Sequence, residues 1–246
     1  MTLSTNKKKF LKSLQLKKFR NEHGVFLVEG EKLFLELLTS NFVVEEVFAT
    51  ERWYNENYNS LPKELNFTMV SERDLATISS FKTPQHVIAV VKQQSFQLTK
   101  NKHQPIIVLD NIQDPGNLGT IIRTMDWFGY ENLVCSPTCV ELYNPKVVQA
   151  TMGSIFRVNT VYRQLNVFFK EHQHFSIYGA LLNGENCFNT NLSKSNSIIV
   201  LGNESKGISR EILPFINKKI TIPKFGNAES LNVSIAAGIL LAEFSR

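Results

Sequence analysis

Polar residues gather in three loops of the second half of the chain, and each loop follows a short apolar run. The first loop is Asp110–Asn117 after Ile106–Leu109, the second loop is Gly202–Gly207 after Ser197–Leu201, and the third loop is Pro223–Asn232 after Ile220–Ile222. In open α/β sheets, ligands bind beyond the carboxyl ends of the strands, so three such loops predict one composite binding site.

The third loop leads directly into an apolar segment that ends at Phe244. Pro223 has no N–H to donate to a sheet, so the strand ends before it. Gly226 follows in the loop, and Ser230 and Asn232 flank Leu231 where a helix is expected to begin. A strand, a glycine loop and a helix start can together turn backbone N–H groups toward a ligand.

The loops lack the common nucleotide-binding fingerprints. Gly116 and Gly119 do not make a GxGxxG pattern, and no GxxxxGK[ST] pattern is present. This argues against a dinucleotide oxidoreductase and against a P-loop enzyme. The histidines have no cysteine or carboxylate partners at metal-ligand spacing, so no metal site is predicted.

The elements that carry these loops alternate between strand and helix. Apolar residues at helical spacing between Leu118 and Phe128, with Gly129 behind them, predict a helix after the first loop. The alternation continues to the last helix and predicts an α/β domain with a mostly parallel sheet over residues 104–246. Residues 1–95 predict a smaller α/β domain, and the polar stretch 96–103 predicts a linker.

Composition agrees with a globular protein, with 43% hydrophobic and 20% charged residues among 246. No apolar run reaches the roughly 18 residues that cross a bilayer, and no secretory leader is visible. The three cysteines form no CxxC pair, which favours a reducing cytoplasm.

Basic residues are concentrated at the amino end, ahead of the first acidic residue, Glu22. They are Lys7, Lys8, Lys9, Lys12, Lys17, Lys18 and Arg20. Apolar residues among them predict an amphipathic helix from Lys7 to Arg20. Such a run is typical of phosphate contacts with nucleic acid, although a solvated helix face is an equal alternative.

The three loops resemble the three motifs of the SpoU (TrmH-type) RNA 2′-O-ribose methyltransferases of the SPOUT group. The first motif spans Asp110–Thr124, the second Val200–Gly207 and the third Ile222–Ala237. The chain before the linker resembles the ribosomal-protein-like substrate-binding domain of that family, mainly in Lys18–Gly30 and Thr83–Val90. Two positions depart from the family pattern: Lys224 stands where an apolar residue is common, and Ser205 replaces a frequent glycine.

The resemblance implies a C-terminal SPOUT domain with a deep trefoil knot, which sequence physics alone would not suggest. It also implies S-adenosyl-L-methionine as the cofactor, bound through Gly202, Ile222 and Leu231, with Leu201 and Gly226 close by. Family members are typically homodimers. The small residues Ala236–Gly238 on the last helix would permit close approach of a partner helix, although burial in the core would also explain them.

The implied reaction is methyl transfer to a ribose 2′-hydroxyl of RNA. By position in the motifs, the resemblance assigns catalytic roles to Arg123, Asn117, Glu204, Ser230 and Asn232. Because an arginine hardly deprotonates, we expect Arg123 to orient the hydroxyl and the adjacent phosphate with its planar fork.

Each of these residues has a simpler interpretation when it is taken alone. Arg123 lies three residues before Asp126 and could form a surface ion pair. Asn117 and Ser230 could merely cap helices, and Glu204 could be a solvent-facing turn residue. Because all of them occur in one predicted site, a functional role is favoured over these simpler interpretations.

By analogy with family members that carry a similar first domain, the resemblance implies ribosomal RNA, 23S in particular, as the substrate. A tRNA 2′-O-methyltransferase and a non-catalytic RNA-binding or ribosome-assembly protein of the same fold are the alternatives.

Overall fold

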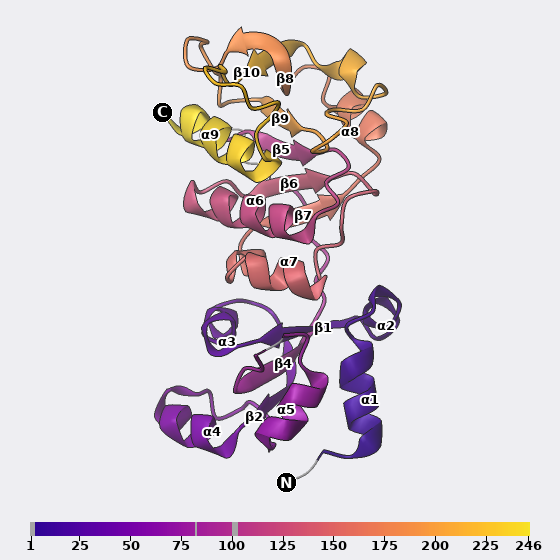
Figure 1. The fold of residues 1–246 in the computed structure, drawn as a ribbon, viewed down its shortest axis with the longest axis vertical. Coiled ribbons are helices and arrows are strands. Elements are labelled where there is room, and N and C mark those ends of the chain that lie inside the picture. Colours follow the sequence, from indigo (N-terminus) through magenta and orange to yellow (C-terminus); the bar gives the residue numbers. More distant parts are fainter. Residues whose placement is uncertain (1–2, 82, 100–102) are drawn as a thin grey trace. The chain divides into compact units, whose positions relative to one another are not determined.

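The computed structural model describes residues 3–81, 83–99 and 103–246. The chain divides into two compact units (Figure 1). Unit 1 comprises Met1–Gln94 and Tyr143–Phe156, and unit 2 comprises Ser95–Leu142 and Arg157–Arg246. The segment Tyr143–Phe156, from the second half of the chain, therefore packs with the first half. Among the described residues, no helix is long and apolar enough to cross a membrane.

Unit 1 is built on a mixed four-stranded sheet with the order β1-β4-β2-β3. Its strands are β1 (Val25–Glu29), β2 (Val44–Ala49), β3 (Phe67–Met69) and β4 (Val87–Lys92). β4 pairs antiparallel with both β1 and β2, and β2 pairs parallel with β3. The edge strand β1 and the central strand β4 are almost wholly buried, in agreement with their content of valine and isoleucine, whereas β2 is buried only in its second half.

The basic amino end forms two short helices instead of the single predicted one. These are α1 (Thr5–Ser13), capped by the Ser4 side chain, and α2 (Lys17–His23). Gly24 ends α2 with a φ of 64°, a conformation that only glycine adopts without strain. Leu11 and Leu14 are fully buried, so this segment is part of the core of unit 1.

The described residues of unit 1 form further α-helices. They are α3 (Glu31–Leu38), α4 (Glu51–Asn57), α5 (Glu72–Ile78) and α7 (Pro145–Ala150). Ser71 caps α5, since its side chain accepts the N–H of Asp74. α7 packs against β1, and its Val147 and Val148 are buried.

Unit 2 contains a six-stranded sheet with the order β10-β8-β9-β5-β6-β7. The strands are β5 (Ile106–Leu109), β6 (Asn132–Cys135), β7 (Asn159–Tyr162), β8 (Ser176–Asn186), β9 (Ser197–Leu201) and β10 (Lys218–Thr221). Every neighbouring pair is parallel, which confirms the predicted parallel α/β domain. Parallel strands place all their carboxyl ends at one edge of the sheet.

Alternate residues of the central strands of unit 2 face different helices. Ile106, Val108, Ile198 and Val200 share a core with α8 (Leu165–Glu171) and with Ile208–Ile216. On the opposite face, α6 (Pro115–Trp127) and α9 (Val233–Ser245) lie side by side (Figure 1). Tyr178 contacts Phe244 of α9 with ring centroids 5.0 Å apart.

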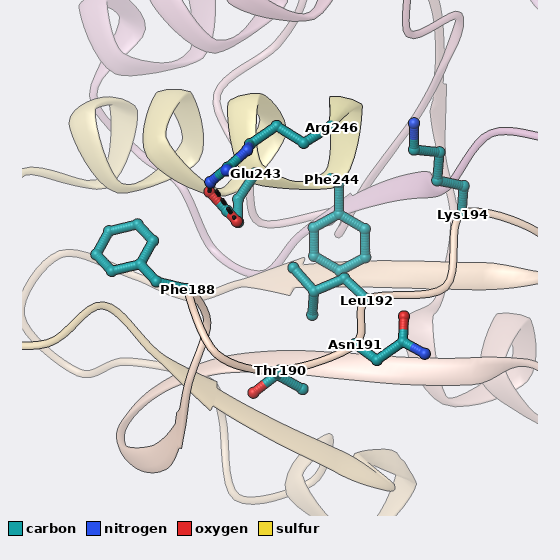
Figure 2. Close-up of a pocket in the computed structure, with 8 residues that line it drawn as sticks. All are labelled: Phe188, Thr190, Asn191, Leu192, Lys194, Glu243, Phe244 and Arg246. Atoms are coloured by element: carbon teal, nitrogen blue, oxygen red, sulfur yellow. Dashed lines mark hydrogen bonds and ion pairs between the residues drawn. The ribbon is translucent and has the colours of Figure 1, made fainter.

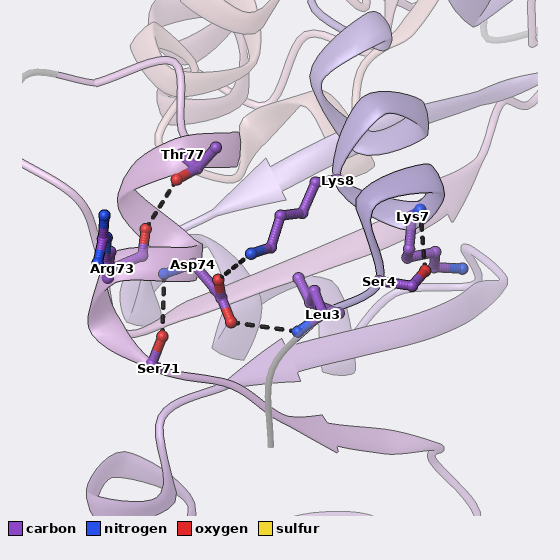
Figure 3. Close-up of polar contacts among 8 residues, drawn as sticks. All are labelled: Leu3, Ser4, Lys7, Lys8, Ser71, Arg73, Asp74 and Thr77. Atoms are coloured by element: carbon purple, nitrogen blue, oxygen red, sulfur yellow. Dashed lines mark hydrogen bonds and ion pairs between the residues drawn. The ribbon is translucent and has the colours of Figure 1, made fainter.

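A buried carboxylate fixes the amino end of unit 1. Asp74 is 3% exposed, accepts the N–H of Leu3 at 3.2 Å and pairs with the Lys8 ammonium at 2.5 Å (Figure 3). The hydrogen bond from Lys8 holds the pKa of Asp74 below its usual value. A carboxyl whose pKa is lower in the folded state stabilises that state at pH values above its unfolded pKa, and the contribution is lost as the pH falls through the folded pKa.

We therefore expect Asp74→Asn to reduce the free energy of unfolding by about 2 kcal/mol at pH 7, because charged hydrogen bonds of this kind are lost. The difference from wild type should shrink below about pH 4, where the wild-type carboxyl also becomes protonated. Urea unfolding between pH 3 and pH 7 measures this difference in the free energy of unfolding. Arg73→Ala, at an exposed position of the same helix, is the control and should give a small difference at every pH. A constant deficit for Asp74→Asn down to pH 3 would contradict the ion-pair explanation.

Candidate active site

The three predicted loops leave the same edge of the sheet of unit 2. The first loop follows β5, the second follows β9, and the third follows β10. β5 and β9 are direct neighbours, so the first two loops start next to each other. The N–H of Asp110 donates to the carbonyl of Leu201 at 2.9 Å, which joins the two loop starts.

The start of α6 leaves the Asn117 side chain available for a tertiary contact. Asp114 caps this helix by accepting the N–H of Asn117 at 2.8 Å, and Pro115 occupies the first turn. The capping role considered for Asn117 is therefore filled by Asp114. The Asn117 side chain donates instead to the Glu204 carboxylate, at 2.8 Å between Nδ2 and Oε1.

Asn232 extends this contact to the third loop. Its Nδ2 donates to Oδ1 of Asn117 at 2.9 Å, while its own Oδ1 accepts the N–H of Ser234 at 2.8 Å and so caps α9. Asn117, Glu204 and Asn232 thus form one hydrogen-bonded chain through all three loops. Glu204 is not a solvent-facing turn residue, because the Asn117 side chain of the first loop donates to it.

The side chain of Ser230, like that of Arg123, lies apart from this chain of bonds. It is exposed, and the cap of α9 is Asn232 rather than Ser230. Residues 223–231 have no backbone hydrogen bond to the described part of the chain. Their N–H and C=O groups therefore remain available to a ligand.

Arg123 does not form the ion pair with Asp126 that the sequence allowed. The Asp126 carboxylate is bound by Arg157, with Nε 2.9 Å from Oδ2. The Arg123 side chain is exposed on α6 and has no hydrogen bond or ion pair to the described residues. Its guanidinium is free to meet an anionic group from outside the chain.

The predicted cofactor-binding residues lie at the ends of β9 and β10 and in the third loop. Leu201 is 2% exposed and Leu231 is 47% exposed. Ile222 is half-buried and Gly226 is exposed. Gly202 is required by the second loop itself, since a Cβ there would lie 2.2 Å from the backbone of Gly207 and of Ile208. Close approach of the loop to itself is thus a sufficient reason for this glycine.

The predicted RNA-binding residues fall into two groups. Lys7 pairs with Glu46, Lys8 pairs with Asp74, and Arg20 is 2% exposed and donates to the carbonyl of Leu14. These three serve the packing of unit 1. The other four, which are exposed, are Lys9, Lys12, Lys17 and Lys18.

The turn of the first loop rests on side chains that sequence reasoning did not single out. Ser136 Oγ accepts the N–H of Asn111 at 2.9 Å, and Cys139 Sγ accepts the N–H of Ile112 at 3.2 Å. A hydrogen bond from Cys135 lowers the pKa of the Cys139 thiol to about 7. Nothing in the spacing of these residues indicates such contacts, because they depend on the pairing of β5 with β6.

A pocket of about 280 Å³ lies elsewhere in unit 2, between the end of α9 and the segment Phe188–Lys194 (Figure 2). Glu243 and Arg246 in its wall pair with each other. None of the predicted site residues lines it. Among the described residues, no group of three or more His, Cys, Asp or Glu could hold a metal ion.

Comparison with known proteins finds two family matches. Residues 104–242 match the SpoU rRNA Methylase family, and residues 6–89 match the MRM3-like substrate binding domain. The chain is 33% identical over 233 residues to the 23S rRNA (guanosine(2553)-2′-O)-methyltransferase RlmP of Bacillus subtilis, covering 94% of this chain and 92% of that protein.

Two solved structures are similar over almost the whole chain. One is a TrmH-family protein of Porphyromonas gingivalis, with a TM-score of 0.87 and 35% identity over 99% of this chain and 98% of that one. The other is an AdoMet-bound rRNA methyltransferase from Sinorhizobium meliloti, with a TM-score of 0.88 and 26% identity over 99% and 96%.

Proposed function

The chain belongs to the SpoU rRNA methylase family, and from that premise we propose that it transfers a methyl group from S-adenosylmethionine to a ribose 2′-hydroxyl of structured RNA. The observation that carries the proposal is the hydrogen-bonded chain Glu204–Asn117–Asn232, which joins all three loops. The exposed Arg123, on the same helix as Asn117, supplies a cation without a partner among the described residues. This reading favours an enzyme over a non-catalytic binding protein.

The third loop fits S-adenosylmethionine. Backbone groups without internal partners between residues 223 and 231 can bind the adenosyl part, and Ile222 and Leu231 offer apolar contacts. When bound, the cofactor supplies an electrophilic methyl group. We assign its contacts to Gly202, Ile222 and Leu231, with Leu201 and Gly226 close by.

The protein's own part in the reaction is to position the ribose hydroxyl. A guanidinium stays protonated in proteins, so Arg123 acts through its charge and planar fork rather than as an ordinary base. It would bind the phosphate next to the target ribose and orient the hydroxyl for in-line attack. Asn117, Glu204 and Asn232 would keep the loops at the geometry that this requires, and Ser230 would contact the nucleotide.

We favour 23S ribosomal RNA over tRNA as the substrate. The relative from Bacillus subtilis is a 23S rRNA methyltransferase, and the first part of this chain matches a substrate-binding domain. We place that domain at residues 1–95 and the methyltransferase domain at 104–246, with 96–103 between them. We also propose a cytoplasmic location, on the cysteine spacing of the sequence.

A test of the activity uses tritiated S-adenosylmethionine and total RNA. A 2′-O-methyl group removes the nucleophile for alkaline cleavage, so label should appear in alkali-resistant dinucleotides. Ribosomal RNA and tRNA assayed separately distinguish the two substrates. RNA binding without label would favour the binding protein, and label in alkali-sensitive nucleotides would place the methyl group elsewhere.

The exposed lysines of α1 and α2 are the proposed RNA contacts. We expect the combined variant Lys9→Ala, Lys12→Ala, Lys17→Ala and Lys18→Ala to weaken RNA binding and to reduce the slope of log K against log salt by up to about 3. Arg20, Lys7 and Lys8 are left out because they hold unit 1 together. Lys32→Ala with Lys63→Ala, at exposed sites of the same unit, is the control. An unchanged slope in the fourfold variant would contradict the proposal.

We also propose that the protein is a homodimer formed through α6 and α9. Trp127 on α6 is 83% exposed and Ile235 on α9 is 55% exposed, although the two helices pack on each other. Of the small residues of α9, Gly238 faces α6 of the same chain, since a Cβ there would lie 3.8 Å from the Thr124 side chain. Sedimentation would show a monomer mass if this proposal were wrong.

The deep trefoil knot of the C-terminal domain likewise stays a prediction from the family resemblance.

A further inference from the structure

The Asn203 side chain, in the second loop, forms four hydrogen bonds, although no role has been assigned to this residue. Its Oδ1 accepts the N–H groups of Ser205 and Lys206 at 3.0 and 3.1 Å. Its Nδ2 donates to the carbonyl of Asn111 at 2.8 Å and to Oε2 of Glu204 at 3.3 Å. Two donors on one side and two acceptors on the other fix the orientation of the amide.

The backbone of Asn203 is held as firmly as its side chain. Its N–H and C=O bond to Gly207 in both directions, at 3.0 and 2.9 Å. Gly207 has a φ of 69° and Asn111 a φ of 60°, so left-handed residues shape both turns that meet at Asn203. The side chain is thus a fixed link between the first and the second loop.

The link acts on the residues of the proposed active site through Glu204. One oxygen of this carboxylate accepts from Asn117 at 2.8 Å and the other from Asn203 at 3.3 Å. Asn117 in turn accepts from Asn232 at the start of α9. A rotation of the Glu204 carboxylate would therefore move the contacts at the starts of both α6 and α9. With both oxygens engaged, Glu204 anchors the first loop to the second.

We propose that Asn203 is a positioning residue for methyl transfer, which orients Glu204 and ties the first loop to the second. This inference rests on the proposed function and assigns Asn203 no contact with substrate. A simple turn uses only the contacts that Oδ1 accepts. The proposed role explains why Nδ2 of Asn203 also donates to Asn111 and Glu204.

The test replaces the Nδ2 donor of Asn203 with an acceptor oxygen in a side chain of the same size. Asn203→Asp keeps the acceptor for Ser205 and Lys206 but sets a carboxylate against the Asn111 carbonyl and Glu204. We expect kcat to fall about 100-fold, as displaced catalytic groups do, with the KM for RNA changed less than about threefold. Adding Glu204→Gln supplies a donor across the 3.3 Å contact and should restore kcat at least about tenfold relative to Asn203→Asp alone. Ser205→Ala, with an exposed side chain in the same loop, is the control.

Thermal unfolding of every variant separates positioning from folding. A lower unfolding temperature with unchanged kcat per folded molecule would overturn the proposal, and so would the absence of any recovery in the double variant. S-adenosylmethionine affinity, measured by calorimetry, gives a readout that does not need RNA. We expect about a tenfold loss in Asn203→Asp and recovery in the double variant. If the wild-type protein labels no RNA, the proposed function is wrong. The role of Asn203 is then decided by calorimetry alone. An S-adenosylmethionine affinity of Asn203→Asp equal to that of wild type would overturn the proposal.

Discussion

Arg123→Ala should lower kcat for RNA methylation about 10³-fold, the loss typical when one group that stabilises a developing charge is removed. The side chain is exposed and has no partner among the described residues, so its removal should leave the unfolding temperature unchanged. S-adenosylmethionine affinity should also stay within about twofold, because Arg123 is assigned to the RNA phosphate and not to the cofactor. Steady-state methylation at saturating RNA measures kcat, and calorimetry measures the affinity.

Two further arginine variants sharpen this result. Arg123→Lys keeps the positive charge but loses the planar fork, so only part of the activity should return. Arg163 lies outside the three loops and pairs with Glu171 at the surface, so Arg163→Ala should have nearly full activity. Full activity in Arg123→Ala would show that orientation of the hydroxyl depends on another group. Full activity in Arg123→Lys would show that charge alone is sufficient.

The sequence carried enough information to place the three loops together. An apolar run before each polar loop predicted parallel strands, and parallel strands bring their carboxyl ends to one edge. The contact between Asn117 and Glu204 is a consequence of that geometry. The resemblance to a family then identified which polar residues to inspect, which spacing alone could not do.

The contacts within the loops could not be read from the sequence. Asp114 and Asn232 act as helix caps where Asn117 and Ser230 were also candidates, because several polar residues near each helix start compete for that position. The ion pairs of Lys7 and Lys8 depend on residues about 40 and 66 positions away, Glu46 and Asp74. A basic run alone therefore cannot show which lysines are free to bind RNA.

The association of residues 143–156 with unit 1 was also invisible in the sequence. Tyr143 packs on Phe26 with ring centroids 4.4 Å apart, and Phe156 meets Phe42 at 5.1 Å. The Tyr143 hydroxyl donates to the carbonyl of Gln94 at 3.0 Å and accepts its N–H at 2.9 Å. Burial raises the pKa of Tyr143 to about 12, so the hydroxyl keeps its proton near neutral pH. These partners lie on the other side of the predicted boundary.

A fragment of residues 104–246 should therefore fail to protect α7, although it holds the whole predicted methyltransferase domain. Without Phe26, Phe42 and Gln94, the apolar side of residues 143–156 has no partner, and hydrogen exchange of the α7 amides should become fast. In the whole chain, Tyr143→Phe should reduce the free energy of unfolding by about 2 kcal/mol, because two backbone groups of Gln94 lose their bond. The same substitution should not change the fragment. The amides of β5 and β9, whose partners lie within unit 2, are the internal control. Equal protection of α7 in the fragment and the whole chain would show that unit 2 alone is sufficient to fold it.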